Sequence, residues 1–224
     1  MITFDEFINN LSKEDKQNFS DYSKMRGVQQ YRIIFETLKK TDPNVEYKDV
    51  NAFIKYDKSI KDVLFTFLGA LEEYIRNDIV LRFDFKNKSK NLKEYHDIKE
   101  LPKCIEKVQK KDEITAFYKY FSLNFGDLIS FIEKYSKDKY DTKSLKKIVK
   151  LRNKVMHHKL LLFDCNFSST KTNTENWIFE LIKQLPNDYP QYLADELNKK
   201  TEKTKSNIKK SYLNFVLSTF ELEN

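Results

Sequence analysis

Glycine and proline are scarce in this chain, which has three Gly and four Pro among 224 residues. A β-sandwich or β-barrel needs many tight turns, so this shortage argues against both and favours helices. Long apolar runs are absent as well, and no stretch approaches the roughly 18 residues needed to span a bilayer. We therefore expect an all-α protein with no membrane partner.

Cysteine is equally rare, and the only two are Cys104 and Cys165. Their spacing fits neither a metal-binding motif nor a disulfide framework. Residues 1–6 lack the basic start and apolar core of a secretory signal. Together these features predict a reducing, cytoplasmic location, and we expect no metal and no cofactor.

Positive charge is in surplus, with a formal net charge of +7 and a pI of about 9.1. Such a balance favours contact with phosphate backbones. Lys, Asn, Ile, Phe and Tyr are all abundant together, however, and this composition bias makes a simple solvated lysine surface an equal alternative. Only five of the 41 basic residues are Arg, so each Arg carries more information than any Lys.

Helical periodicity is clear in the first half of the chain. Thr3 is expected to cap a first helix, and a second is expected from Val28 to Lys39, before Pro43. Apolar residues recurring at helical spacing predict a long helix from about residue 57 to 85. A loop is expected at 87–91 and a short helix from Pro102.

The second half continues the helical pattern. Residues 114–135 predict two helices that meet near Phe125 and Gly126, or one kinked helix. Asp141 or Thr142 should cap the next helix, and residues 166–176 read as a loop. Trp177 opens an amphipathic segment that Pro186 ends, and a last helix is expected over 202–220. We expect one domain over residues 1–224, with 203–224 as an appended helix.

Some of the rarer side chains converge near Arg152. His157 and His158 follow it by five and six residues, and the chain has only one other His. A permanent cation beside groups that exchange protons near neutral pH suits cleavage of a phosphodiester. The same residue types also suit a plain polar interface between packed helices.

The position of Arg152 on its helix predicts a partner. It continues an expected buried stripe formed by residues 145, 148, 149, 155 and 156, and a buried guanidinium without a partner is very unfavourable. Glu72 stands at the edge of the apolar face of the long helix, one turn before Arg76. We therefore expect Glu72 to contact Arg152 and to fix its direction.

The expected chemistry needs no metal. Asn153 and His157 are four residues apart and share a helix face, whereas His158 lies about 100° further round. Adjacent His residues cannot comfortably chelate one ion, and no Cys or carboxylate set joins them. A histidine can instead take a proton from a ribose 2′-hydroxyl, which makes RNA the substrate. One His157 per chain is few for two proton transfers, so a homodimer is expected.

Three segments resemble a known family. The stretch from Arg152 to Leu160, with its Arg-Asn-x-x-x-His-His pattern, resembles the signature of HEPN-domain ribonucleases, in particular the Abi-like abortive-infection branch of the AbiD and AbiF kind. Residues 71–76 resemble the branch's helix of Ile-Glu-x-x-Leu-Arg type. Residues 121–128 resemble its segment ending in Phe-Gly-x-Leu, and the order of the three also matches.

The resemblance implies an all-α, HEPN-like helical bundle with additional N- and C-terminal helices and a core of about residues 57–163. It implies a homodimer with metal-independent endoribonuclease activity, in which Arg152 and His157 are catalytic and Asn153 is auxiliary. Glu72, Arg76 and His158 take supporting roles. Members act as toxins or phage-defence effectors, which implies a protein antitoxin or noncoding RNA as inhibitor. A catalytically silent RNA-binding or dimerisation module remains the alternative.

Overall fold

The computed structural model describes residues 2–82, 124–135 and 140–222, and all statements below concern these residues. Its regular structure is helical, which confirms the all-α class. In chain order the elements are α1 (Phe4–Asn9), α2 (Lys13–Arg26), α3 (Val28–Lys39), α4 (Tyr47–Arg82), α8 (Phe125–Tyr135), α9 (Thr142–Met156), α10 (Lys171–Gln184), α11 (Tyr189–Lys205) and the 3-10 helix η1 (Lys210–Phe215).

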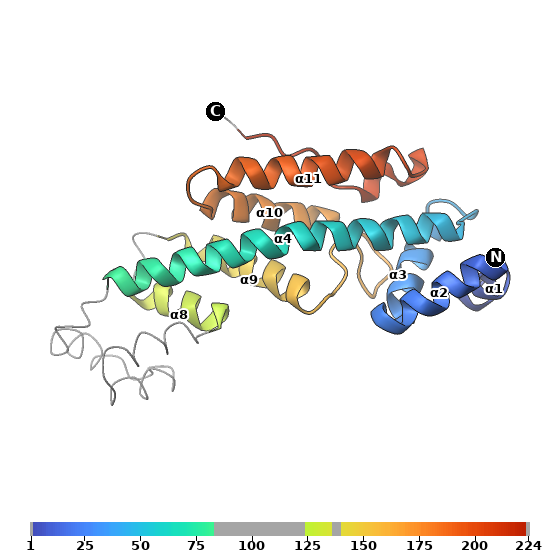
Figure 1. Ribbon diagram of the computed structural model, residues 1–224, viewed down its shortest axis with the longest axis horizontal. Helices are drawn as coiled ribbons and strands as arrows, with labels where there is room; N and C mark the ends of the chain where they lie inside the picture. The colour runs from blue at the N-terminus through green and yellow to red at the C-terminus, as the bar shows by residue number, and fades with distance from the viewer. Residues whose placement is uncertain (1, 83–123, 136–139, 223–224) are drawn as a thin grey trace.

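Helix α4 is the axis of the molecule. Its 36 residues run along the whole body, with α11 on one side and α9 and α8 on the other (Figure 1). Helices α1 to α3 pack at its N-terminal end, through α3. Apolar side chains at helical spacing make it the centre of the core, because nearly all their surface is buried: Val50, Phe53, Ile60, Leu64, Leu68, Leu71 and Ile75.

Local sequence signals predicted α1 and α3 in the N-terminal part of the chain. Thr3 caps α1 in a capping box with Glu6, as expected, and α3 has the expected bounds. Helix α4 starts at Tyr47, ten residues before the expected start. Helix α2 was not expected, because its sequence is almost wholly polar and shows no apolar stripe. Ser12 nevertheless caps it, accepting a hydrogen bond from the Asp15 N–H at 3.1 Å.

The C-terminal part differs more from expectation. Helix α10 begins at Lys171, inside the segment expected to be a loop. The expected helix over 202–220 is wrong, since α11 ends at Lys205 and is followed by η1 and an extended segment. The expected loop at 87–91, the helix from Pro102 and residues 114–123 lie outside the described residues. Helix α8 does start at Phe125, where a helix boundary was expected.

Long-range contacts with α4 and with the loop before it accompany the departure of the C-terminal segment from an α-helix. Lys209 reaches the Asn44 carbonyl at 2.6 Å and the buried Asp49 carboxylate at 3.0 Å. Burial lowers the pKa of Lys209, but the hydrogen bond and charge of Asp49 outweigh burial and raise it. Further on, the Leu217 N–H donates to the Tyr56 hydroxyl at 3.3 Å. The Leu217 N–H thus bonds to a side chain of α4, in place of the backbone carbonyl that an α-helix would offer.

A single tyrosine joins three segments at this point. The Tyr56 hydroxyl of α4 is 2.8 Å from the Thr201 hydroxyl of α11, and both residues are almost fully buried. Together with the bond from Leu217, it ties α4, α11 and the C-terminal segment to one another. Burial raises the pKa of Tyr56 to about 12. Among the residues described, no helix is both long and apolar enough to cross a membrane.

Replacement of Tyr56 by Phe should lower the free energy of unfolding by about 1–3 kcal/mol, because it leaves buried polar groups of Leu217 and Thr201 unpaired. The pKa of Tyr56 is raised from 10.0 to about 12, so its contribution is complete below pH 10 and is lost as pH rises through about 12. Urea unfolding should therefore show the wild-type advantage shrinking over that range. The exposed Tyr74→Phe is the control, and an equal effect of both changes contradicts the assignment.

Candidate functional site

Helix α9 is positioned by its start and by its buried face. Asp141 caps it, as expected, accepting hydrogen bonds from the backbone N–H groups of Lys143 and Ser144 at 3.0 and 3.3 Å. Its buried side chains face the core, and α9 contacts α4, α8 and α10. They are Ser144, Leu145, Ile148, Leu151 and Val155. Arg152, Asn153 and His157 lie near the C-terminal end of α9, outside this buried set.

Arg152 stands at the edge of that buried face. Leu151, not Arg152, continues the buried stripe, and the Arg152 side chain keeps 26% of its surface exposed. The expectation that Arg152 lies on the buried face is met only in part: its Nε is buried, but the side chain as a whole lies at the rim. This position leaves the cation able to meet an anion from solvent.

The expected contact between Glu72 and Arg152 is present. Glu72 Oε2 lies 3.6 Å from Arg152 Nε, and Glu72 Oε1 accepts a hydrogen bond from Arg76 on the same helix. All three side chains are mostly buried, so water screens their charges less than at an open surface. Two guanidinium groups share this one carboxylate.

The end of α9 is a Schellman motif. His157 is the C-cap residue, and His158 follows with a positive φ of 52°. The His158 N–H donates to the Val155 carbonyl at 3.1 Å, and the Lys159 N–H donates to the Lys154 carbonyl at 2.9 Å. Both histidines are exposed. The motif thus gives the backbone that carries both exposed imidazoles a defined geometry.

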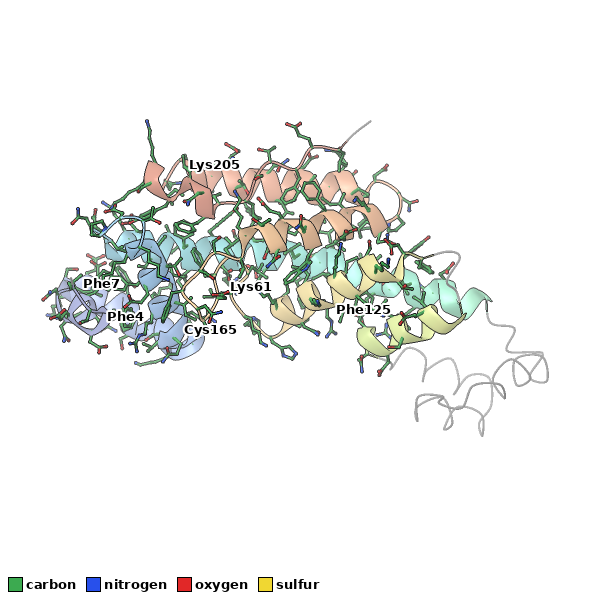
Figure 2. The ribbon with its side chains drawn as sticks, turned by 180° about the vertical axis from the view of Figure 1, so that it is seen from behind. Phe4, Phe7, Lys61, Phe125, Cys165 and Lys205 are labelled. Carbon is green, nitrogen blue, oxygen red and sulfur yellow. The ribbon has the colours of Figure 1, made fainter. Side chains whose placement is uncertain are left out.

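Residues from two other helices hold this turn in place. The His158 carbonyl accepts hydrogen bonds from Gln30 of α3 at 3.0 Å and from Lys61 of α4 at 3.5 Å. The buried Asp57 carboxylate accepts the Leu161 N–H at 2.7 Å and pairs with Lys61 at 2.5 Å. Figure 2 labels Lys61 and, in the loop beyond the turn, Cys165. The turn that carries both histidines is thus held by α3 and by α4.

Asn153 lies one turn before His157. Its side chain is exposed, and its carbonyl accepts the His157 N–H at 3.1 Å, which places the two residues on one face as expected. Lys154 lies beside them with its ammonium 5.4 Å from the Trp177 ring centre, and burial lowers its pKa. The exposed amide of Asn153 and the exposed imidazole of His157 thus form a polar face at the C-terminal end of α9.

Sequence reasoning missed the residues that support the turn. Asp57 and Lys61 are four apart on α4, a spacing that signals an ion pair, but nothing in the sequence connects them with Leu161. Gln30 gives no signal of its own. Within residues 2–82, 124–135 and 140–222, no group of three His, Cys, Asp or Glu side chains is placed to hold a metal ion. Cys165 is exposed there, and Cys104 lies outside these ranges.

Replacement of Glu72 by Ala should lower the free energy of unfolding by about 1–3 kcal/mol. The change leaves Arg76 and Arg152 facing one another without the shared carboxylate, while partial exposure lets water offset some of the cost. The control is Glu73→Ala, because Glu73 is the exposed neighbour on the same helix. Chemical denaturation measures both, and equal small effects would show that the Glu72 contacts contribute no stability.

His158 should behave as a turn residue. Its positive φ is unfavourable for any residue with a Cβ, so His158→Gly should leave the free energy of unfolding unchanged or raise it by about 1 kcal/mol. His158→Val should lower it, because a β-branched residue fits this conformation poorly. Thermal unfolding of the two variants measures both changes in stability. If the Gly variant is destabilised as much as the Val variant, the imidazole itself makes a stabilising contact.

Comparisons with protein-family models, with curated proteins and with solved structures found no match to this chain.

Proposed function

We propose that this chain is a metal-independent endoribonuclease that acts as a homodimer. One observation carries the proposal: a guanidinium held by a carboxylate at the protein rim lies on the same helix end as an exposed imidazole on a fixed turn. Arg152, tethered by Glu72, and His157 are those two groups. A fixed cation and a proton-exchanging group are the two components that phosphodiester cleavage requires.

The reaction uses the ribose as its own nucleophile. Neutral His157 takes the proton of the 2′-hydroxyl, and the 2′-oxygen attacks phosphorus. The bond from phosphorus to the 5′-oxygen breaks, and an imidazolium gives that oxygen a proton. The products are a 2′,3′-cyclic phosphate and a 5′-hydroxyl. Arg152 stabilises the extra negative charge on the phosphoryl oxygens, and Asn153 donates a hydrogen bond to one of them or orients the imidazole.

The second proton transfer needs a second imidazole. His158 occupies the left-handed position of the turn, and apart from these two the described residues include no His. A twofold axis beside the end of α9 would bring the partner's His157 to the same phosphate, and the exposure of Asn153 and His157 leaves this face open to a second copy. The dimer is therefore part of the proposed mechanism.

Assignment to the HEPN ribonucleases is part of this proposal. Its support is that the three segments carrying the resemblance belong to helices in contact. Glu72 and Arg76 lie on α4, Phe125 to Leu128 open α8, and Arg152 lies on α9, which contacts both. A toxin or phage-defence role follows from that assignment, as does an inhibitor, either a protein antitoxin or a noncoding RNA. The cytoplasm is the location in which such an enzyme would meet its RNA.

A second candidate is a catalytically silent RNA-binding or dimerisation module of the same fold. The net charge of +7 favours it, because lysine-rich surfaces bind phosphate backbones without any chemistry. The Glu72 contacts are also compatible with a purely structural Arg152. The two candidates differ in one measurable respect, since only the first breaks RNA.

Incubation with RNA in the presence of EDTA tests the proposal. Arg152→Ala and His157→Ala should each reduce the cleavage rate by at least about 100-fold, because one removes charge stabilisation and the other removes proton transfer. Arg32→Ala is the matched control, since Arg32 is an exposed arginine of α3. Analysis of the products should find 2′,3′-cyclic phosphate ends, and DNA should not be cut.

Three outcomes would overturn the assignment. Cleavage that persists in both variants would place the chemistry elsewhere, and 3′-hydroxyl products would exclude attack by the 2′-oxygen. RNA that binds to the dimer but is never cut would favour the silent module.

A further inference from the structure

A groove of about 480 Å³ lies between the N-terminal part of α4 and the C-terminal end of α11. The two helices run side by side in opposite directions (Figure 1), and Lys205, labelled in Figure 2, marks the end of α11 beside which it opens. We call it the lysine groove. It is lined by Lys48, Asn51, Ala52, Lys55, Tyr56, Ser59, Lys200, Lys203, Thr204, Asn207 and Ile208.

Basic residues line both walls of the lysine groove. Lys48 and Lys55 stand two turns apart on one face of α4, and Lys200 and Lys203 stand one turn apart on α11. At 1.5 Å per residue, the α4 pair spans about 10 Å along the groove. The positive charge is thus extended along the groove and not concentrated at one point.

The lining contains no carboxylate. Lys48 pairs with the exposed Glu46 at 2.8 Å, whereas the described part of the chain gives Lys55, Lys200 and Lys203 no ion-pair partner. Three ammonium groups around one groove repel one another, and they are stabilised when an anion lies between them. The chain has 34 acidic residues, so their absence here is a property of this surface and not of the composition.

Buried contacts below the groove fix its walls. Tyr56 forms part of the lining, and its hydroxyl binds Thr201 of α11 at 2.8 Å and accepts the Leu217 N–H. The two lysine-bearing faces are therefore held at a set separation before any ligand arrives. A preformed site loses less conformational freedom on binding than a flexible one.

The lysine groove and the Arg152 site lie on different sides of α4. Lys55 and Ser59 face the groove, whereas Asp57 and Lys61, each two positions further along, face the end of α9. Two helical positions differ by about 200°, so the two sets point in nearly opposite directions. Changes to the groove lysines thus leave the Arg152 site intact.

We propose that the lysine groove binds the phosphate backbone of an RNA strand. A strand fits better than a single phosphate, because the basic residues are spread over about two helical turns and the neutral amides of Asn51 and Asn207 lie among them. The groove offers no exposed aromatic ring for base stacking, so binding is by charge and is tolerant of sequence. This binding site does not depend on the proposed cleavage reaction.

The test compares two triple variants of the full-length chain, each also carrying Arg152→Ala so that the RNA stays intact. The first is K55Q/K200Q/K203Q. The second, K13Q/K16Q/K183Q, removes the same charge from exposed lysines elsewhere. Fluorescence anisotropy with a labelled single-stranded RNA of about 12 nucleotides gives the affinity over a range of salt concentrations. Thermal unfolding confirms that both variants are folded.

The groove variant should bind at least about tenfold more weakly at low salt, and its salt slope should fall by about 2, since each lost phosphate contact removes about 0.7. The control variant should keep most of the affinity. Equal losses in both variants, or no RNA binding by the parent chain, overturn the proposal. Complete displacement of RNA by millimolar inorganic phosphate also overturns it, because it would identify a single-anion site. Cleavage by the chain with Arg152 restored is measured separately, so failure of one proposal leaves the other testable.

Discussion

The carboxylate of Asp57 is the contact on which the arrangement of the site depends. It is almost fully buried on α4, and its two oxygens accept the Leu161 N–H and the Lys61 ammonium. A buried charge is tolerated only when such partners compensate it. Because Leu161 comes three residues after His158, the same carboxylate fixes the path of the chain as it leaves α9. A charge on a different helix therefore fixes the backbone that follows both histidines.

The sequence predicted those parts of the fold that local chemistry decides. Thr3 and Asp141 cap their helices, as predicted. The spacing of apolar residues was enough to predict α3 and the middle of α4 without knowledge of their tertiary contacts. The parts it did not predict are those decided by distant partners. Helix α2 is too polar to show an apolar stripe. After Lys205 the chain forms η1 and then an extended segment, and Lys209 and Leu217 there bond to residues of α4 and of the loop before it.

The candidate site shows the same division. A guanidinium between packed helices requires an anionic partner, and on this ground the sequence predicted the contact between Glu72 and Arg152. The structure contains that contact. The sequence did not predict how far Arg152 is buried, since Leu151 takes the core position and Arg152 remains at the rim. The left-handed conformation of His158 was not foreseen either, because a C-terminal turn of this kind is usually marked by Gly. That these groups cut RNA is our proposal.

The hydrogen bond from Gln30 to the His158 carbonyl has a consequence for the N-terminal helices. Residues 1–50 lie outside the three segments that carry the family resemblance, so a shortened chain could leave them out. Gln30 instead makes α3 a brace for the turn that carries both imidazoles. A chain shortened to its α4–α11 body would retain every side chain discussed for catalysis, and yet it would lose one of the supports that keep them aligned.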